Sequence, residues 1–125
     1  MATTVLLVDD QPDILEITAY MLEDAGYDVI CAKDSDEAKQ RAREQASRQR
    51  EIGVVVTDLH LPHGGNGIEM GVDMRRNGLL TCPWLIVSGS VEPWQISQHD
   101  WMSYLPKPFA REALLQKIIA LACDH

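Results

Sequence analysis

The sequence predicts an α/β fold in which a doubly wound parallel sheet is covered by helices on both faces. Short runs of uncharged, often β-branched residues alternate along the chain with segments that have helical spacing. The strand candidates are apolar at consecutive positions, as in GVVVT and WLIVS, so both faces of the sheet are expected to be buried. A length of 125 residues with 46% hydrophobic residues suffices for one core. Residues 1–125 are therefore predicted to form a single domain.

The chain is predicted to open with a strand and a helix. Residues 4–8 (TVLLV) are apolar and partly β-branched, which indicates a strand. Pro12 stands where the first turn of a helix tolerates proline. The apolar face of this helix is marked by Ile14, Ile17, Met21 and Ala25. Gly26 is expected to end the helix, because glycine readily adopts the left-handed conformation found there.

A second strand, a second helix and a third strand follow. Residues 28–32 (DVICA) are predicted to form the second strand. Asp34 followed by Glu37 three residues later resembles a capping box, so a helix is predicted from there to about Gln49. The third strand is predicted at residues 53–57 (GVVVT).

The second half of the chain continues the alternation. After a glycine-rich loop, a helix is predicted from about residue 67 to 76, and a fourth strand at 84–88 (WLIVS). A short fifth strand is expected around 103–105 (SYL), and a last helix at about 110–122. The apolar stripe of the last helix consists of Leu114, Leu115, Ile118, Ile119 and Ala122.

Residues 91–101 (VEPWQISQHDW) depart from this regularity. They contain Pro93 and show no clean helical spacing. We therefore expect the fourth helix to be short, with at most two turns, or irregular. Trp94 and Trp101 in this segment are candidates either for a partner-binding patch or for packing over the sheet edge.

Composition and charge exclude several classes of function. The net charge of -8 argues against a nucleic-acid surface, and the basic residues between Lys33 and Arg50 are interpreted as a solvated helix face. The apolar runs are too short to span a membrane and the first residues do not resemble a signal peptide, so a cytoplasmic chain is expected. The three cysteines form no CxxC pair and are predicted to be reduced thiols, without a disulfide or zinc site.

Candidate functional residues fall at one edge of the predicted sheet. Doubly wound sheets bind ligands beyond the carboxyl ends of their strands, at the point where the strand order reverses. The polar residues at these ends are Asp9, Asp10, Asp58, Ser88 and Lys107. Three carboxylates and one ammonium group sum to a charge of -2, which would destabilise the fold unless a cation intervened. Oxygen ligands without a cysteine or histidine cage suit Mg²⁺.

Four stretches, each at the end of a strand, carry a resemblance to a known family. They are VLLVDD (5–10), VVVTDLHLP (54–62), LIVSGS (85–90) and YLPKPF (104–109). In these stretches the chain resembles the CheY-like receiver domain of two-component response regulators. The resemblance extends from about Thr4 to Ala120. It implies a flavodoxin-like five-stranded sheet in the order 2-1-3-4-5, and a signalling phosphoacceptor that assists its own phosphorylation and dephosphorylation rather than an enzyme.

The resemblance also implies a role for each site residue. Asp58 would be the phosphoacceptor, taking a phosphoryl group from a phosphohistidine. Asp10, Asp58 and the backbone carbonyl of His60 would hold Mg²⁺ directly, and Asp9 would act through a bound water. Phosphoryl binding and switching would involve Ser88, Gly89, Tyr104 and Lys107, which would change the surface around strands four and five. The bond between Lys107 and Pro108 would be cis.

The partners implied are proteins that carry a phosphohistidine, namely a histidine kinase or a histidine phosphotransfer protein. The docking surface would comprise Gln11, Ile14, Leu15, Pro108 and Phe109. The protein would be a monomer or a phosphorylation-dependent dimer, acting on an effector that the sequence does not identify. Neither nucleic acid nor a membrane is expected as a partner of this domain.

Three alternatives stay open at this point. The chain could be a pseudo-receiver, which binds partners without phosphorylation, although no residue of the acid pocket is missing. It could be the receiver piece of a hybrid histidine kinase. A Mg²⁺-dependent aspartyl phosphatase of the haloacid dehalogenase type would need a DxD motif after the first strand, and VDDQPD does not supply it.

Overall fold

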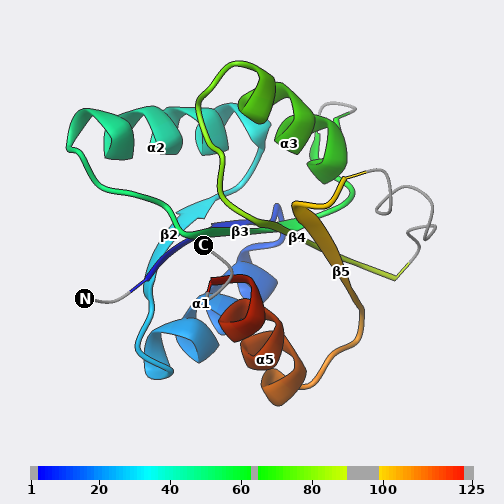
Figure 1. Ribbon diagram of the computed structural model, residues 1–125. Coiled ribbons are helices and arrows are strands. Elements are labelled where there is room, and N and C mark those ends of the chain that lie inside the picture. The colour runs from blue at the N-terminus through cyan, green and yellow to red at the C-terminus, as the bar shows by residue number, and fades with distance from the viewer. Residues whose placement is uncertain (1–2, 63–64, 90–98, 123–125) are drawn as a thin grey trace.

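The protein folds around one parallel sheet, seen edge-on in Figure 1. The computed structural model describes residues 3–62, 65–89 and 99–122. The strands are β1 (Thr4–Val8), β2 (Asp28–Ala32), β3 (Val54–Asp58), β4 (Trp84–Ser88) and β5 (Met102–Pro106). They lie in the order β2-β1-β3-β4-β5, and every neighbouring pair is parallel. The predicted flavodoxin-like, doubly wound fold is confirmed.

Two helices cover each face of the sheet. They are α1 (Pro12–Asp24), α2 (Ser35–Ser47), α3 (Gly67–Arg76) and α5 (Arg111–Ala122). In Figure 1, α2 and α3 lie above the sheet, and α1 and α5 lie below it. Because successive side chains of a strand point to opposite faces, β1 contributes to two separate cores. Leu6 and Val8 pack under α2 and α3, while Val5 and Leu7 pack against α1 and α5.

Local sequence signals set most of the helix ends. The Asp34 carboxylate accepts a hydrogen bond from the backbone N–H of Glu37 at 2.8 Å, which confirms the predicted cap of α2. The Glu37 carboxylate returns to the N–H of Lys33 rather than to that of Asp34. Gly26 follows α1 with a φ of 99°. Helix α2 ends at Ser47, slightly before the predicted end, and Gln49 turns the chain with a φ of 57°.

The predicted apolar face of α1 is not its buried face. The side chains that α1 buries are Thr18, Ala19 and Leu22, whereas Ile17 is 54% exposed and Ile14 is 38% exposed. The prediction followed the larger apolar side chains, whereas Thr18 lies one helical turn before Leu22 on the face that meets the sheet. In the predicted apolar stripe of α5, Leu114 and Ile118 are buried, but Ile119 is 54% exposed.

Two strand boundaries differ from the prediction. Strand β3 begins at Val54 and includes Asp58, whose carboxylate therefore stands on the last residue of the strand instead of after it. Strand β5 runs over five residues, from Met102 to Pro106, where a shorter strand was expected. Both strands pair with β4, and this pairing extends the regular backbone beyond what the local sequence indicates.

The prediction of a short or irregular fourth helix concerns residues 91–101, of which 90–98 lie outside the described residues, Trp94 included. Trp101 is described, and its ring meets that of Trp84 edge to face, with centroids 6.2 Å apart. The guanidinium of Arg75 lies over the ring of Trp101, 4.5 Å from its centroid. Trp101 therefore packs over the sheet edge.

The basic segment of α2 is only in part a solvated face. The ammonium group of Lys39 lies 2.8 Å from the carboxylate of Asp73, so it ties α2 to α3. This hydrogen-bonded cation lowers the pKa of Asp73. Cys31 and Cys82 are free thiols, and burial raises the pKa of Cys82 to about 11. Within the described part of the chain, no helix is long and apolar enough to cross a membrane.

Candidate phosphoryl and metal site

Three carboxylates meet at the carboxyl end of the sheet. Asp9 and Asp10 directly follow β1, Asp58 ends β3, and these two strands are neighbours in the sheet. The parallel register sets Val8 beside Thr57, which brings the two acidic segments to the same level. One oxygen atom from each of the three carboxylates lies within 4.8 Å of the others. Such a cluster has the size and the ligand type of a site for a hard divalent cation.

A single ammonium group faces this acidic cluster. The Nζ atom of Lys107 lies 3.4 Å from the Oδ2 atom of Asp58 and 3.8 Å from the Oδ2 atom of Asp9. Lys107 follows β5, and its backbone N–H donates to the carbonyl of Ser88 at 3.1 Å. The bond between Lys107 and Pro108 is cis. Sheet pairing and this backbone bond therefore direct Lys107 towards two strands that are not its neighbours in sequence.

Asp9 is the most buried acid of the cluster. The residue is 6% exposed, and its Oδ1 atom accepts a hydrogen bond from the backbone N–H of Gln11 at 2.9 Å. Burial raises the pKa of Asp9, and this effect outweighs the hydrogen bond from Gln11 and the charge of Lys107, which lower it. Asp10 is exposed and Asp58 is half-buried. The cluster thus holds one desolvated carboxylate and two that solvent can reach.

The predicted switch residues lie beside the cluster. Ser88 is buried at the end of β4, next to β3. The hydroxyl of Tyr104 donates to the backbone carbonyl of Ser88 at 2.8 Å, and the Tyr104 ring packs against the core under α2 and α3. Among the described residues, a Cβ atom at Gly89 would meet nothing closer than the Lys107 carbonyl oxygen at 3.9 Å.

Backbone hydrogen bonds connect the two described parts of the segment after Asp58, residues 59–62 and 65–66, which we call the acceptor loop; residues 63–64 lie outside the described residues. His60 pairs with Asn66 in an antiparallel bridge. The N–H of Leu61 donates to the carbonyl of Gly65, and the N–H of Gly67 donates to the carbonyl of Leu59. These backbone bonds hold the acceptor loop between the end of β3 and the start of α3.

Two residues that support Asp58 were missed by the sequence analysis. The hydroxyl of Thr57 donates to the backbone carbonyl of Asp58 at 3.0 Å. A Cβ atom at Gly67 would lie 2.5 Å from the same carbonyl oxygen, so this position admits only glycine without a shift of the backbone. A glycine at the start of a predicted helix was a usable signal for Gly67. Nothing in the sequence indicated the contact of Thr57.

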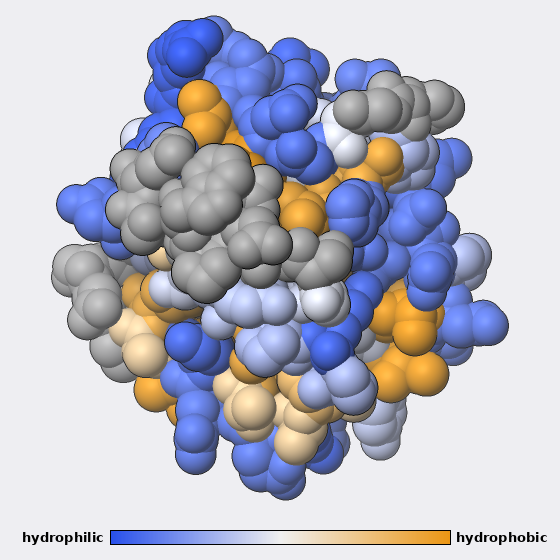
Figure 2. Space-filling model, turned by 90° about the vertical axis from the view of Figure 1, so that its right-hand side faces the viewer, coloured by the Kyte–Doolittle hydropathy of each residue, from blue (hydrophilic) through white to orange (hydrophobic). Residues whose placement is uncertain are grey.

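The predicted docking residues are partly gathered around the acids. Ile14 and Phe109 line a small cavity of about 20 Å³ together with Asp58 and Lys107. Gln11 is exposed at the start of α1, and Leu15 packs against the core under α1 and α5. Figure 2 shows the face that lies on the right in Figure 1, where the coloured hydrophobic residues form small patches between hydrophilic ones. A partner at this edge would therefore meet a mixed surface.

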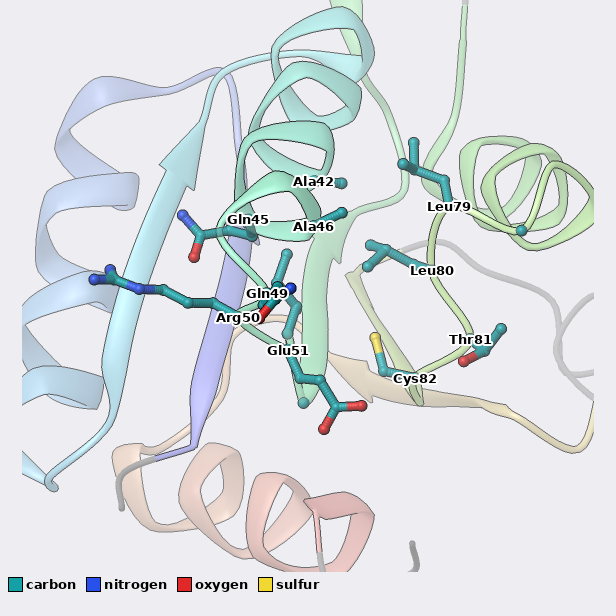
Figure 3. A pocket seen from close by; sticks show the side chains of 13 residues that line it. Ala42, Gln45, Ala46, Gln49, Arg50, Glu51, Leu79, Leu80, Thr81 and Cys82 are labelled. Carbon is teal, nitrogen blue, oxygen red and sulfur yellow. The ribbon is translucent and has the colours of Figure 1, made fainter.

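A larger cavity than the one beside the acids lies elsewhere. It has a volume of about 480 Å³ and lies between the end of α2 and the segment that joins α3 to β4, near the amino ends of β3 and β4. Leu80 and Cys82 face it, while Arg50 extends away from them (Figure 3). Its charged groups do not converge, so its size alone does not make it a functional site.

Comparisons with known proteins establish the family. A family model described as the response regulator receiver domain matches residues 5–119, and the chain therefore belongs to this family. The structure is similar to the chemotaxis protein CheY4 of Vibrio cholerae, with a TM-score of 0.83 and 26% identity over 97% of this chain and 99% of that chain. It is also similar to the receiver domain of the hybrid histidine kinase CckA, with a TM-score of 0.77 and 26% identity over 95% and 98% of the two chains.

A third solved structure agrees in fold alone. It is a CheY-like receiver domain protein from Methanospirillum hungatei, with a TM-score of 0.78 and 24% identity over 99% of this chain and 96% of that chain. The protein is thus a receiver domain of two-component signalling. Receiver domains bind Mg²⁺ at an acidic pocket and interact with histidine kinases or phosphotransfer proteins, and this chain has a cluster of three acids, Asp9, Asp10 and Asp58.

Proposed function

We propose that Asp58 accepts a phosphoryl group from the phosphohistidine of a partner kinase or phosphotransfer protein. The observation that carries this proposal is the convergence of three carboxylates and one ammonium group on the carboxyl edge of the sheet. In the reaction, a carboxylate oxygen of Asp58 forms a bond to phosphorus while the bond from phosphorus to the histidine nitrogen breaks. Asp58 becomes an acyl phosphate, and the electron pair of the broken bond stays with the imidazole.

The residues around Asp58 orient the carboxylate and compensate charge. Thr57 and Gly67 fix the backbone of Asp58 through its carbonyl oxygen. The ammonium of Lys107, 3.4 Å from the Asp58 carboxylate, supplies positive charge where the transferred phosphoryl oxygens arrive. The hydroxyl of Ser88 is the neutral donor on the β4 side. Phosphoryl transfer depends mainly on such positioning and electrostatic stabilisation.

The donor set fits Mg²⁺. The cluster offers three carboxylates, which are ligands that suit a hard divalent cation, and a cation there would favour the charged form of Asp9, whose pKa burial raises. Asp10, Asp58 and the carbonyl of His60 would hold the ion, with Asp9 acting through a water. When bound, Mg²⁺ supplies positive charge that offsets the approach of an anionic phosphoryl group to an anionic nucleophile.

Phosphorylation replaces a charge of about -1 on Asp58 by about -2 and adds acceptor oxygens. In this proposal Ser88 and Lys107 bind these oxygens, and Tyr104, whose hydroxyl donates to the backbone carbonyl of Ser88, moves with Ser88. The result is a shift between two arrangements of the surface at β4 and β5. We further propose that residues 1–125 act as one cytoplasmic domain, without turnover of a free substrate, and that Gln11, Ile14, Leu15, Pro108 and Phe109 contact the phosphodonor.

The test is phosphorylation with a small acyl-phosphate donor and Mg²⁺, followed by intact mass spectrometry. The wild type should gain the mass of one phosphoryl group. Asp58→Asn should gain none, because an amide cannot act as the nucleophile. Asp13→Asn is the matched control, since Asp13 is an exposed acid at the start of α1, and this variant should behave as the wild type.

An unmodified wild type under saturating donor would contradict the proposal and favour a pseudo-receiver. Turnover of a free phosphomonoester would instead favour a phosphatase. Omission of Mg²⁺ should abolish the adduct in the wild type, and a phosphorylation rate that does not change without the ion would contradict the role of the acidic cluster.

A further inference from the structure

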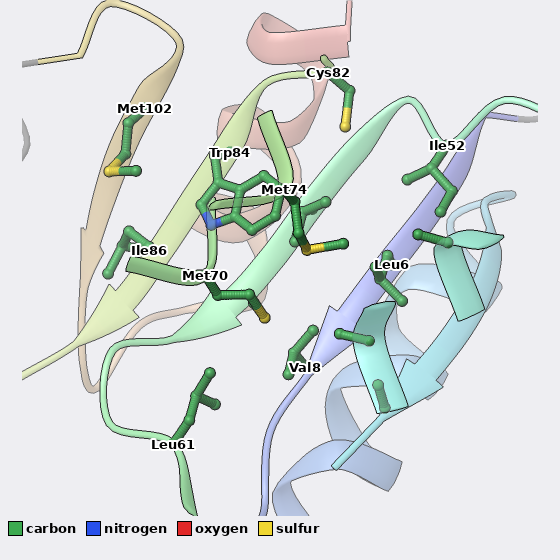
Figure 4. Close-up of a cluster of buried hydrophobic side chains, with 14 of the residues drawn as sticks. Leu6, Val8, Ile52, Leu61, Met70, Met74, Cys82, Trp84, Ile86 and Met102 are labelled. Atoms are coloured by element: carbon green, nitrogen blue, oxygen red, sulfur yellow. The ribbon is translucent and has the colours of Figure 1, made fainter. Parts of the chain in front are cut away.

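Trp84, the first residue of β4, is a buried side chain that carries an obligatory hydrogen-bond donor. It is 1% exposed, and its indole Nε1–H donates to the carbonyl of Gly67 at 3.0 Å. The ring itself packs beside Met74 of α3 in the core under α2 and α3 (Figure 4). A buried indole N–H needs an acceptor, and the carbonyl of Gly67 supplies it.

The acceptor of this bond lies next to the phosphoacceptor. Gly67 is the first residue of α3 and follows the acceptor loop. Its own N–H closes that loop by donating to the carbonyl of Leu59 at 2.8 Å, and its Cα lies against the carbonyl of Asp58. Gly67 is therefore fixed on two sides. One side is the loop that carries the His60 carbonyl, and the other is the indole of Trp84.

Gly71 supports this arrangement from within α3. A Cβ atom there would lie 2.9 Å from Cε2 and 3.0 Å from Nε1 of Trp84, and 3.2 Å from Cζ3 of Trp101. The absence of a side chain at Gly71 thus lets the indole edge that bears the N–H approach the helix. The hydrogen bond joins Trp84 of β4 to Gly67 of α3, which lie 17 positions apart in the chain.

We propose that Trp84 is a positioning residue for the acceptor loop. Its N–H holds Gly67, and through Gly67 it holds the backbone that presents Asp58 and the His60 carbonyl to the cation and the phosphoryl group. The expected consequence is tighter binding of Mg²⁺, and this consequence rests on the proposed function. The role of Trp84 in the loop itself concerns the backbone hydrogen bonds of Leu61 and Gly67, and it can be tested without Mg²⁺.

The test compares two ways of disturbing the bond with two matched controls. Trp84→Phe removes the N–H and keeps an aromatic ring. Gly71→Ala keeps the N–H and displaces the indole. Ile118→Val trims a buried side chain in the opposite core, and Arg76→Ala changes an exposed residue of α3, so both leave the bond intact. Gly71→Ala decides the question alone if Trp84→Phe does not fold.

The first readout is amide hydrogen exchange of the metal-free proteins by NMR. The amides of Leu61 and Gly67 close the loop, and they should exchange about threefold to tenfold faster in Trp84→Phe and Gly71→Ala than in the wild type, which is the range for one lost hydrogen bond. In the two controls these amides should exchange at the wild-type rate. Loop amides at control rates in both test variants would overturn the proposal.

The second readout is Mg²⁺ affinity by titration. Trp84→Phe and Gly71→Ala should each bind Mg²⁺ about tenfold more weakly, which is the lower end of the cost when a group that holds a metal ligand is removed. If a variant shows faster amide exchange in the acceptor loop but binds Mg²⁺ as tightly as the wild type, the proposed effect of the loop on Mg²⁺ binding would be overturned. A wild type that binds no Mg²⁺ would contradict the proposed function, and hydrogen exchange would still decide the role of Trp84.

Discussion

At the scale of single residues, the site is a balance of one positive and three negative side chains. Lys107 reaches both Asp9 and Asp58, and each of these acids also lies close to Asp10. A cation in the cluster and the ammonium of Lys107 therefore compete for the same carboxylates. A phosphoryl group relieves this competition, because it brings oxygens for both positive charges.

Replacement of Lys107 separates these two roles. Lys107→Met keeps the apolar stem and removes the charge, so Mg²⁺ should bind about fivefold more tightly, equivalent to about 1 kcal/mol for a partly exposed ion pair. Phosphorylation by a small donor should become slower, since the phosphoryl oxygens lose their cation. Titration and the rate of adduct formation measure the two effects. Lys117→Met, at an exposed position of α5, should change neither, and weaker Mg²⁺ binding in Lys107→Met would contradict the competition.

The burial of Asp9 predicts a pH-dependent stability of the metal-free protein. Its pKa is raised in the folded state, so this group stabilises the fold below the unfolded pKa, and that contribution is lost as the pH rises through the folded pKa. At pH 7 the charged carboxylate destabilises the fold. Asp9→Asn keeps an acceptor for the N–H of Gln11 and should raise the free energy of unfolding at pH 7, with a smaller gain at pH 4.

Urea unfolding at the two pH values, with and without Mg²⁺, measures this effect. Mg²⁺ should stabilise the wild type more than Asp9→Asn. Asp28→Asn is the control, because Asp28 is an exposed acid at the start of β2. A metal-free Asp9→Asn that is less stable than the wild type at pH 7 would mean that desolvation does not dominate at this residue.

The sequence predicted the charged residues of the site because each follows or ends an apolar run, and parallel strands end at a common edge. It did not predict the uncharged side chains that hydrogen-bond to the backbone of Asp58 and Gly67. Thr57 and Trp84 look like ordinary strand residues, and their roles depend on contacts with Asp58 and Gly67 that exist only after folding. Side chains that donate to backbone carbonyls leave no signal in the sequence of their acceptor.

At the scale of elements, the start of α3 is the most constrained junction. Its cap is local, since the Asn66 side chain accepts from the N–H of Glu69 at 2.8 Å. Its position is set from outside, by the Asp58 carbonyl, the Leu59 carbonyl and the indole of Trp84 that meet at Gly67. The helix is thereby attached to β3 and β4 at the point where the phosphoacceptor stands.

Gly67→Ala tests this junction. The new Cβ atom would lie 2.5 Å from the Asp58 carbonyl oxygen and 2.8 Å from Cγ2 of Thr57, so the free energy of unfolding should fall by about 1–3 kcal/mol, the usual cost of overpacking. Gly65→Ala is the matched control, because a Cβ atom there would meet nothing within 4 Å. Urea unfolding measures both variants, and equal stabilities would contradict the close packing at Gly67.

Element boundaries and faces were predicted with unequal success. The cap at Asp34 and the end at Gly26 have local causes, and they were predicted correctly. The buried face of α1 was not, because Ile14 and Ile17 form an apolar stripe of their own, and only the sheet decides which stripe is covered. The exposed stripe stands on the helix that begins beside the acids, where we propose that the phosphodonor docks.

At the scale of the whole molecule, the sheet order places the chemistry. Because β1 and β3 are adjacent, the two acids that follow β1 meet the acid that ends β3. Because β4 and β5 come next in the sheet, Ser88 and Lys107 reach the same edge. The alternation of strands and helices along the sequence predicted a parallel sheet with helices on both faces. The order of the strands came from the resemblance to receiver domains, because apolar strands of similar length carry no local information about their neighbours.

The most direct test of the central claim is to locate the phosphoryl group in the wild-type protein. After reaction with an acyl-phosphate donor and Mg²⁺, borohydride reduces an aspartyl phosphate to homoserine, and peptide mass spectrometry then identifies the altered position. The account predicts homoserine at position 58 and unaltered aspartates at positions 9 and 10. Homoserine at another aspartate, or none anywhere under saturating donor, would contradict it.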